Sequence, residues 1–275
     1  MANFWKIVNQ VIRNADVLLL LLDARMIEET RNKEIEDKVK QSGKPLIYVI
    51  TKSDLADKDE IERYKKYKRT EMKPLVFVSS IKHHGTTILR ERILIEAKRA
   101  GFNKESNNKS KQCLVKVGIL GYPNVGKSTL INALSGRKAS PTSNTSGYTK
   151  SLQNVRADNR IMLIDTPGVI PYMEKDAGKH AAIGTIDYNK MKDPDIAVMG
   201  LMRDFPRKIE EHYGFKTDAN KDKRYESEDY EEHIDYEETL EKIAIKKKIL
   251  KKGNKPDIDK TSRMILKDWQ DGKIK

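Results

Sequence analysis

Residues 121–129 have the composition of a phosphate-binding loop. They read Gly-Tyr-Pro-Asn-Val-Gly-Lys-Ser-Thr and so fit the pattern G-x-x-x-x-G-K-S. In such a loop, glycines let successive backbone N–H groups point at phosphate oxygens, and the following helix adds its positive N-terminal end. The Lys127 ammonium can reach the outer phosphates of a nucleotide, and the Ser128 hydroxyl can ligate Mg²⁺. The pattern predicts that these residues bind the phosphates: Asn124, Val125, Gly126, Lys127, Ser128 and Thr129.

The segments on either side of this loop strengthen the prediction. The apolar run 114–120 is typical of a buried strand, and residues 130–134 are typical of a helix. A strand, a glycine loop and a helix in that order are the context of a P-loop. An ordinary glycine-containing turn between a strand and a helix does not require the Lys-Ser pair.

A second polar cluster follows the apolar segment 45–50 and fits the guanine-recognition pattern [NT]-K-x-D. The Asp54 carboxylate can accept hydrogen bonds from guanine N1–H and N2–H, whereas adenine would leave the buried charge unpaired. Sites that depend on such pairs discriminate by about 10⁴–10⁵. We expect Lys52 to lie along the P-loop and the base. The pattern predicts that these residues bind the base: Thr51, Lys52, Ser53 and Asp54.

A partial match concerns the base-contacting loop usually written S-A-K. Ser79 and Ser80 end the apolar segment 75–78 and would take this position, with Ser in place of Ala.

A third pattern, D-x-x-G, occurs at residues 165–168. In this element the Asp165 carboxylate would hold Mg²⁺, and the Gly168 N–H would sense the γ-phosphate. Thr149 ends a segment rich in Ser, Thr, Gly and Pro, and it is the candidate switch threonine that closes on Mg²⁺ and the γ-phosphate. The predicted metal ligands are Ser128, Thr149 and Asp165, and the predicted catalytic residues are Lys127, Thr149 and Gly168.

The elements that must position these loops alternate along the chain. Strands are expected at 15–23, 45–50, 75–78, 114–120, 151–156 and 160–164. Helices are expected at 28–41, 58–68, 86–99 and 130–134, with Thr86 or Thr87 as the cap of the third. Ligand loops at the carboxyl ends of strands are typical of a doubly wound, mostly parallel α/β sheet. Beyond it only helical patterns remain, at 194–202, 206–212, 239–250 and 256–271. We therefore expect a nucleotide-binding domain over 1–174 and a small all-helical domain over 175–275.

The composition limits the class of protein. The formal net charge is +13, with 54 Lys and Arg against 41 Asp and Glu, which favours a polyanionic partner such as RNA. Enrichment in Lys and Glu is also typical of proteins from hot environments. One Cys and scattered His give no zinc ligand cluster. No signal peptide or membrane span is indicated, since the apolar run Val17–Leu22 is too short for a bilayer. We expect a cytoplasmic protein.

The order of the motifs is unusual, because the base-reading patterns precede the P-loop. A circular permutation leaves strand neighbours in space unchanged, so the site can still assemble. In this order the chain resembles the YlqF/RbgA family of circularly permuted ribosome-assembly GTPases. The matching segments are 22–25, 31–32, 51–54, 121–132, 149–151, 165–168, 256–257 and 265–274.

This resemblance implies a P-loop GTPase that binds GTP or GDP with Mg²⁺, and K⁺ near Asn124. Val169 stands where Ras-like enzymes place a water-orienting Gln, so hydrolysis should be slow and need activation by ribosomal particles. Bacterial members begin Trp-Phe-Pro-Gly-His-Met, whereas this chain has no His before His83. No catalytic His is therefore assigned, and His83 and His84 are expected to be solvated loop residues or RNA contacts.

The function expected from these observations is that of a nucleotide-gated assembly factor for the large ribosomal subunit or its precursor. It would act as a monomer and bind rRNA through its basic surface and its C-terminal helical domain. Three alternatives stay open: an RNA-binding scaffold with negligible turnover, an ATP-dependent P-loop enzyme, and a GTPase that acts on transfer RNA or in translation.

Overall fold

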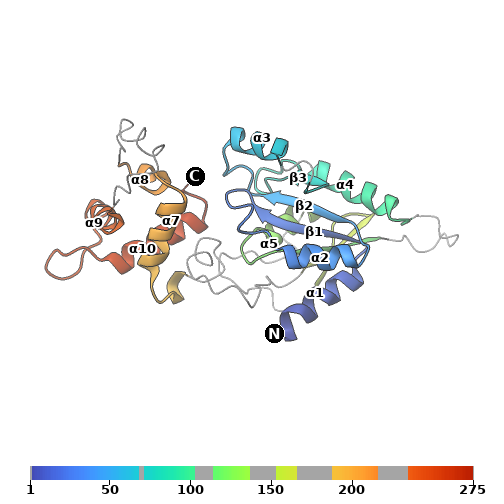
Figure 1. The fold of residues 1–275 in the computed structure, drawn as a ribbon, viewed down its shortest axis with the longest axis horizontal. Coiled ribbons are helices and arrows are strands. Elements are labelled where there is room, and N and C mark those ends of the chain that lie inside the picture. Colours follow the sequence, from blue (N-terminus) through green and yellow to red (C-terminus); the bar gives the residue numbers. More distant parts are fainter. Residues whose placement is uncertain are drawn as a thin grey trace. The chain divides into compact units, whose positions relative to one another are not determined.

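Six strands form one sheet in the order β3-β2-β1-β4-β6-β5 (Figure 1). All neighbours pair in parallel except β5 and β6, which are antiparallel. The predicted α/β fold with a mostly parallel sheet is thereby confirmed. The strands are β1 Val17–Asp23, β2 Leu46–Thr51, β3 Leu75–Phe77, β4 Val115–Leu120, β5 Gln153–Arg156 and β6 Ile161–Asp165.

The structure is a computed structural model that describes residues 2–67, 71–102, 114–136, 153–165, 188–215 and 235–274. The chain divides into two units, Met1–Lys175 and Asp176–Lys275. The sheet belongs to the first unit. Its helices are α1 Ala2–Asn14, α2 Lys33–Gln41, α3 Lys58–Tyr67, α4 Thr86–Arg99 and α5 Lys127–Ser135.

The strand order reverses between β1 and β4. From β1 the chain continues to β2 and β3 on one side, whereas from β4 it continues to β6 and β5 on the other side. Leu20 lies opposite Leu120 in the register of the two central strands. In doubly wound sheets, ligands bind outside the carboxyl ends of the strands at such a reversal. We therefore expect the loops that follow β1, β2 and β4 to bind the ligand.

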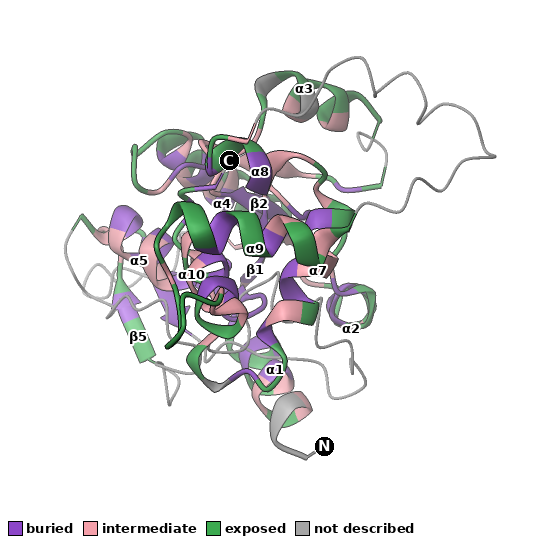
Figure 2. Ribbon diagram, turned by 90° about the vertical axis from the view of Figure 1, so that its left-hand side faces the viewer, coloured by how far each residue is buried: buried purple, intermediate pink, exposed green. Residues whose placement is uncertain are grey.

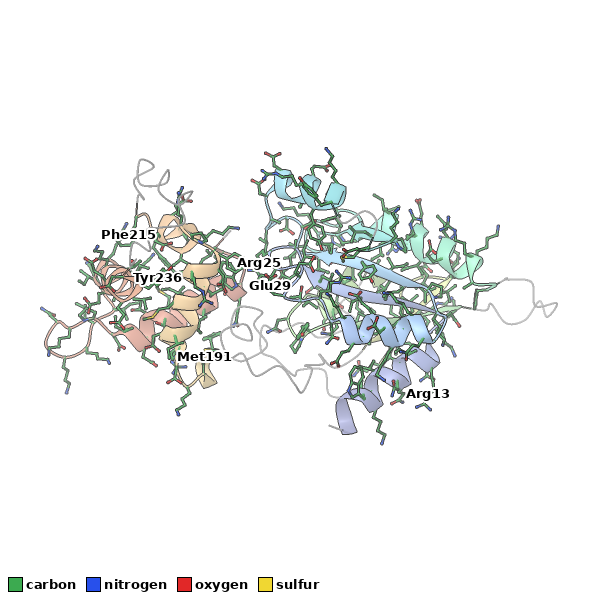
Figure 3. The ribbon with its side chains drawn as sticks, in the orientation of Figure 1. Arg13, Arg25, Glu29, Met191, Phe215 and Tyr236 are labelled. Carbon is green, nitrogen blue, oxygen red and sulfur yellow. The ribbon has the colours of Figure 1, made fainter. Side chains whose placement is uncertain are left out.

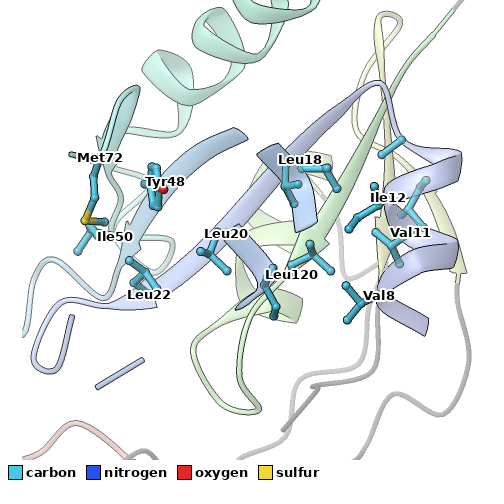
Figure 4. Packing of buried hydrophobic residues seen from close by; sticks show 14 of the residues in the cluster. Val8, Val11, Ile12, Leu18, Leu20, Leu22, Tyr48, Ile50, Met72 and Leu120 are labelled. Atoms are coloured by element: carbon cyan, nitrogen blue, oxygen red, sulfur yellow. The ribbon is translucent and has the colours of Figure 1, made fainter. Parts of the chain in front are cut away.

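Every residue of the leucine run of β1 is buried (Figure 2), and Figure 4 shows Leu18, Leu20 and Leu22 in the core cluster. Side chains alternate along a strand, so Leu18, Leu20 and Leu22 share one face. They pack with Val8 of α1 and with buried residues of α2 in one core cluster. The opposite face is left for α4 and α5, which contact each other, and α4 also contacts β1 and β4.

Three helices of the first unit differ from the sequence-based expectations in ways that the structure explains. Helix α1 was not expected, and it forms because its apolar side chains Val8, Val11 and Ile12 are buried against the sheet. Helix α2 begins at Lys33 and not at residue 28, because the Asn32 side chain caps it by accepting from Ile35 N at 3.0 Å.

The start of α4 also differs in its cap. Thr86 or Thr87 was expected to cap this helix, but Gly85 takes the N-cap position with φ +78° and no side-chain hydrogen bond. Thr86 is the first residue of the helix, and its hydroxyl donates to His83 O at 3.2 Å. A side chain at Gly85 would meet Phe77 O at 2.2 Å, so only glycine fits this position.

In the second unit every described regular element is helical. After the short helix η1, Tyr188–Lys190, come α7 Pro194–Asp204, α8 Lys208–His212, α9 Tyr236–Lys246 and α10 Ile258–Gln270. Trp269 is fully buried, and its ring lies 4.8 Å from that of Phe205. Helix α9 ends four residues earlier than expected, so Lys247 to Leu250 lie outside it. Among the described helices of the whole chain, none combines the length and apolar character needed to cross a bilayer.

Candidate nucleotide-binding site

The loop between β4 and α5 depends on two glycines with positive φ. Gly121 has φ +148°, and a side chain there would lie 2.8 Å from Leu21 O of β1. Gly126 has φ +94° and takes the N-cap position of α5. Asn124 has φ +60°, a conformation that Asn tolerates better than most residues. The local sequence thus permits a tight loop whose backbone leads into the N-terminus of α5.

Lys127 lies inside this loop. Its ammonium donates to Gly121 O at 3.1 Å and to Tyr122 O at 2.5 Å, and the side chain is buried. Burial lowers the pKa of the ammonium to about 7, although the nearby Asp165 carboxylate opposes the shift. A phosphate at this position would offer Lys127 a charged acceptor in place of the two carbonyls.

Phosphate binding should therefore be coupled to protonation of Lys127. With a pKa of about 7, most of the Lys127 side chain is a neutral amine at pH 8. A bound phosphate favours the charged ammonium and raises this pKa again. Nucleotide binding at pH 8 should therefore take up close to one proton per chain. Calorimetric titration with GDP in buffers of different ionisation enthalpy measures this uptake. Lys127→Met should abolish it. Equal heats in all buffers for the wild-type chain would contradict the assignment.

The chain also offers oxygen ligands suited to Mg²⁺. Asp165 ends β6 and is fully buried, Ser128 lies in the first turn of α5, and these two elements are in contact. Carboxylate and hydroxyl oxygens are hard ligands of the kind that Mg²⁺ prefers. Thr149, the third predicted metal ligand, and Gly168, the predicted γ-phosphate sensor, lie outside the described residues.

A single hydroxyl joins the base-reading segment to the P-loop. Thr51 ends β2, and its Oγ1 lies 2.6 Å from Val125 O and 2.9 Å from Leu22 O. A side chain at Gly126 would lie 3.7 Å from Thr51 Cβ. Residues separated by more than seventy positions in the chain are thus in direct contact at the carboxyl end of the sheet. Two of the predicted motifs are brought together.

Removing this hydroxyl is expected to weaken both the fold and nucleotide binding. Thr51→Val keeps the shape but removes the donor, which should lower the free energy of unfolding by about 1–3 kcal/mol because buried carbonyls lose their partner. The affinity for GDP should also fall, since the two loops lose their connection. Urea unfolding and calorimetric titration measure the two effects. Thr51→Ser retains the hydroxyl and is the matched control; a valine variant that behaves like the serine variant would refute the role.

The remaining predicted base contacts lie at the ends of β2 and β3. Ser53 N donates to Val78 O at 3.3 Å, and Asp54 follows in the next turn. Ser79 is buried and exchanges backbone hydrogen bonds of 3.0 Å with His84, whereas His84 and His83 are exposed. Ser80 is half-buried beside them. These loops and the P-loop all follow the carboxyl ends of strands of the parallel sheet.

A buried ionic cluster, to which the sequence reasoning gave no role, holds Lys52. The Asp23 carboxylate at the end of β1 binds Lys52 Nζ at 2.8 Å and Arg25 Nη2 at 2.9 Å, and Arg25 Nε lies 3.1 Å from its other oxygen. Burial alone would raise the pKa of Asp23, but the charges of Lys52 and Arg25 outweigh it and hold that pKa far below its ordinary value. Figure 3 shows Arg25 at the carboxyl end of the central strands, away from Arg13.

Asp23 is therefore expected to position Lys52. Asp23→Asn removes the buried carboxylate that pairs with both cations, and it should lower the free energy of unfolding by about 3 kcal/mol, because the charges of Arg25 and Lys52 lose this partner. Urea unfolding measures the loss. Asp37→Asn is the matched control, since Asp37 is exposed and its contact with Lys40 is 4.0 Å long. Equal stability of the two variants would show that Asp23 has no such role.

Comparison with known proteins agrees with this geometry. Residues 116–249 match the family model described as a 50S ribosome-binding GTPase. The match begins in β4, after the strand and loop that carry the base-reading motif. These residues thus resemble the GTPases of that family. An uncharacterized GTP-binding protein of Methanocaldococcus jannaschii is 41% identical to this chain over 273 residues, which cover 98% of the chain and 65% of the relative.

Two further proteins resemble the chain over most of its length. The nuclear GTP-binding protein NUG1 of Saccharomyces cerevisiae is 32% identical over 294 residues, which cover 98% of the chain but only 54% of NUG1. The chain therefore spans 54% to 65% of the length of these two curated relatives. GNP-bound YlqF from T. maritima has the same fold, with a TM-score of 0.62 at 21% identity over 98% of this chain and 94% of that chain.

Proposed function

We propose that the chain binds GTP, hydrolyses it slowly, and acts as a nucleotide-gated assembly factor for the large ribosomal subunit. The observation that carries the proposal is the contact between Thr51 Oγ1 and Val125 O, 2.6 Å apart. It supports the assignment of both motifs to one nucleotide, with the base beside the residues after β2 and the phosphates beside the loop after β4.

Each part of the nucleotide has a proposed recognition group. Asp54 accepts hydrogen bonds from the guanine edge, and Lys52, held by Asp23, lies along the base. The phosphates contact the backbone of the loop and Lys127. Mg²⁺ would be held by Ser128, Thr149 and Asp165, and it would neutralise charge that develops on the phosphates. Gly168 would sense the γ-phosphate, and K⁺ would bind near Asn124.

Slow turnover follows from the residue after the D-x-x-G motif. Val169 is aliphatic and cannot orient or polarise an attacking water, as a Gln does in Ras-like enzymes. An activating group must then come from the particle to which the protein binds. This dependence would make hydrolysis a signal that the particle has been engaged.

The ribosomal target is supported by the family description and by charge. The matching family is described as ribosome-binding, and the chain carries a net charge of +13. In the second unit, exposed lysines crowd the end of α9 and the loop after it. They are Lys246, Lys247, Lys248, Lys251, Lys252 and Lys255. Clustered lysines bind phosphates through counterion release, so this unit is the proposed contact with rRNA.

The experiment that tests the proposal combines turnover and binding. GTP hydrolysis is measured with and without large ribosomal subunits, and sedimentation with the subunits is compared in a GTP analogue and in GDP. We expect strong stimulation of hydrolysis and tighter association in the analogue. Small subunits are the control and should stimulate little.

The alternatives give different outcomes. Nucleotide-dependent association without stimulated hydrolysis would favour an RNA-binding scaffold. Stimulation by transfer RNA and not by subunits would favour a role in translation. Association that is weak and equal in both nucleotides would overturn the proposed gating.

A further inference from the structure

A groove of about 1000 Å³ lies at the edge of the sheet formed by β3, between α3 and α4. Its lining comes from α3, from α4, from the residues that lead into β3 and from β3 itself. None of the phosphate-binding or base-binding candidates belongs to the lining. The groove is a feature that the nucleotide site does not use.

The charge of the lining is strongly positive. The lining contains six cations and two carboxylates, Glu62 and Glu96, so its formal net charge is +4. The cations are Arg63, Lys65, Lys66, Lys73, Arg92 and Arg99.

The carboxylates neutralise only part of this charge. Glu96 is buried and pairs with Arg92 at 3.5 Å and Arg99 at 2.9 Å, and Glu62 pairs with Lys65 at 2.8 Å. In the part of the chain that the structure describes, the three other cations are exposed and have no carboxylate within 4.0 Å. These are Arg63, Lys66 and Lys73.

Helix stability does not account for the whole set. Basic residues in the last turn of a helix interact favourably with its dipole, which explains Lys65 and Lys66 in α3 and Arg99 in α4. Arg63 and Arg92 lie before those turns, and Lys73 lies outside any helix. Interaction with the helix dipoles therefore explains only part of the positive charge of the lining.

The floor of the groove is apolar. Met72 is fully buried there, and Leu75 and Phe77 are partly buried and pack against the main core cluster. The Lys65 ammonium lies 5.1 Å from the centre of the Phe77 ring, so one wall cation already covers an aromatic face. An apolar floor between basic walls suits a ligand with a sugar or base on one side and phosphates on the other.

The groove and the base-reading loops use different residues. The groove reaches Phe77, the last residue of β3, but its lining includes none of the base-reading residues that follow β2 and β3. Arg63, Lys66 and Lys73 are exposed and lie outside those loops, so their substitution should leave the nucleotide site intact.

We propose that this groove binds the sugar-phosphate backbone of RNA, as a contact of the first unit additional to the basic loop of the second unit. The inference rests on the proposed role in ribosome assembly, because it assumes that RNA is a partner. It assigns part of that recognition to the GTPase unit itself.

The test uses the full chain with a triple substitution in the groove, Arg63→Gln, Lys66→Gln and Lys73→Gln. The matched control carries Lys6→Gln, Arg13→Gln and Lys33→Gln, which remove the same charge from exposed positions on α1 and α2. Binding of fluorescein-labelled oligouridine is measured by anisotropy over a range of salt concentrations, with polyglutamate as a second polyanion. GDP affinity and the thermal unfolding midpoint check that each variant is intact.

We expect the groove variant to bind oligouridine about 100-fold more weakly than the wild type at about 0.1 M salt, because each lost phosphate contact removes about 0.7 from the slope of log K against log salt. The slope should become shallower by about 2, and the control should lose less than about tenfold. GDP affinity should be unchanged in both.

The outcomes separate this inference from the proposed function. If the wild-type chain binds oligouridine but the two triple variants lose equal affinity, the groove assignment is overturned and the proposed function stands. If the groove variant loses polyglutamate binding alone, the occupant is an acidic protein segment and the RNA assignment is wrong. If the wild-type chain does not bind RNA, both proposals fail.

Discussion

Asp54→Asn is expected to lower the affinity for GTP by about 100- to 10,000-fold. The carboxylate would accept two hydrogen bonds from the guanine edge, and each bond to a charged group contributes about 1.5–3 kcal/mol. An asparagine amide would direct its NH₂ group at one of the guanine donors. The same amide can donate to the C2 carbonyl of xanthine, so affinity for XTP should rise. Calorimetric titration with GTP, XTP and ATP measures the three affinities.

The matched control for this variant is Asp57→Asn. Asp57 is exposed, three residues further along the chain, and accepts from Asp59 N at 2.7 Å. Asn can make the same hydrogen bond, so GTP affinity should not change. Equal losses of GTP and ATP affinity in Asp54→Asn would mean that the residue supports the fold and does not read the base.

Lys127→Met is expected to weaken GTP and GDP binding by about 100- to 1,000-fold. Removing one partner of a buried charged contact costs about 2–5 kcal/mol, and the phosphates would lose the ammonium that lies inside the loop. Methionine fills a similar volume, so the fold should be retained. Nucleotide affinity is measured by titration, and thermal unfolding verifies the fold.

Lys116→Met is the control for the lysine variant, because Lys116 is exposed on β4 and its removal changes the net charge equally. GTP affinity of this control should stay close to that of the wild type. A Lys127→Met protein that is folded and still binds GTP tightly would exclude the P-loop as the phosphate site.

The fold could be predicted where one local signal sufficed. The leucine run of β1 could only be a strand covered on both faces, and the P-loop pattern placed α5 directly after β4. Helix α1 was missed, because only the sheet explains the burial of Val8 and Val11.

The contacts of the candidate site needed the three-dimensional register. Asp23 lies opposite Thr51 in the pairing of β1 with β2, which brings Lys52 next to the Asp23 carboxylate. Residues 22–25 could be matched to a family from the sequence, but the ion pair depends on that register. The contact of Thr51 with Val125 depends likewise on the order of β2, β1 and β4.

The switch residues stay predictions of the sequence. Thr149 and Gly168 lie outside the described residues, so their assignment depends on motif and resemblance alone. Asp165, which begins the same motif as Gly168, is described and lies buried at the end of β6.

The most direct test of the central claim is a calorimetric titration of the wild-type, Asp54→Asn and Lys127→Met chains with GTP and ATP. A single nucleotide that spans both loops predicts one GTP per chain, a preference over ATP of at least about 10⁴, and weakening of the same binding event by either substitution. Tight ATP binding in the wild-type chain, or a GTP site that survives both substitutions, would show that the two loops do not share a nucleotide.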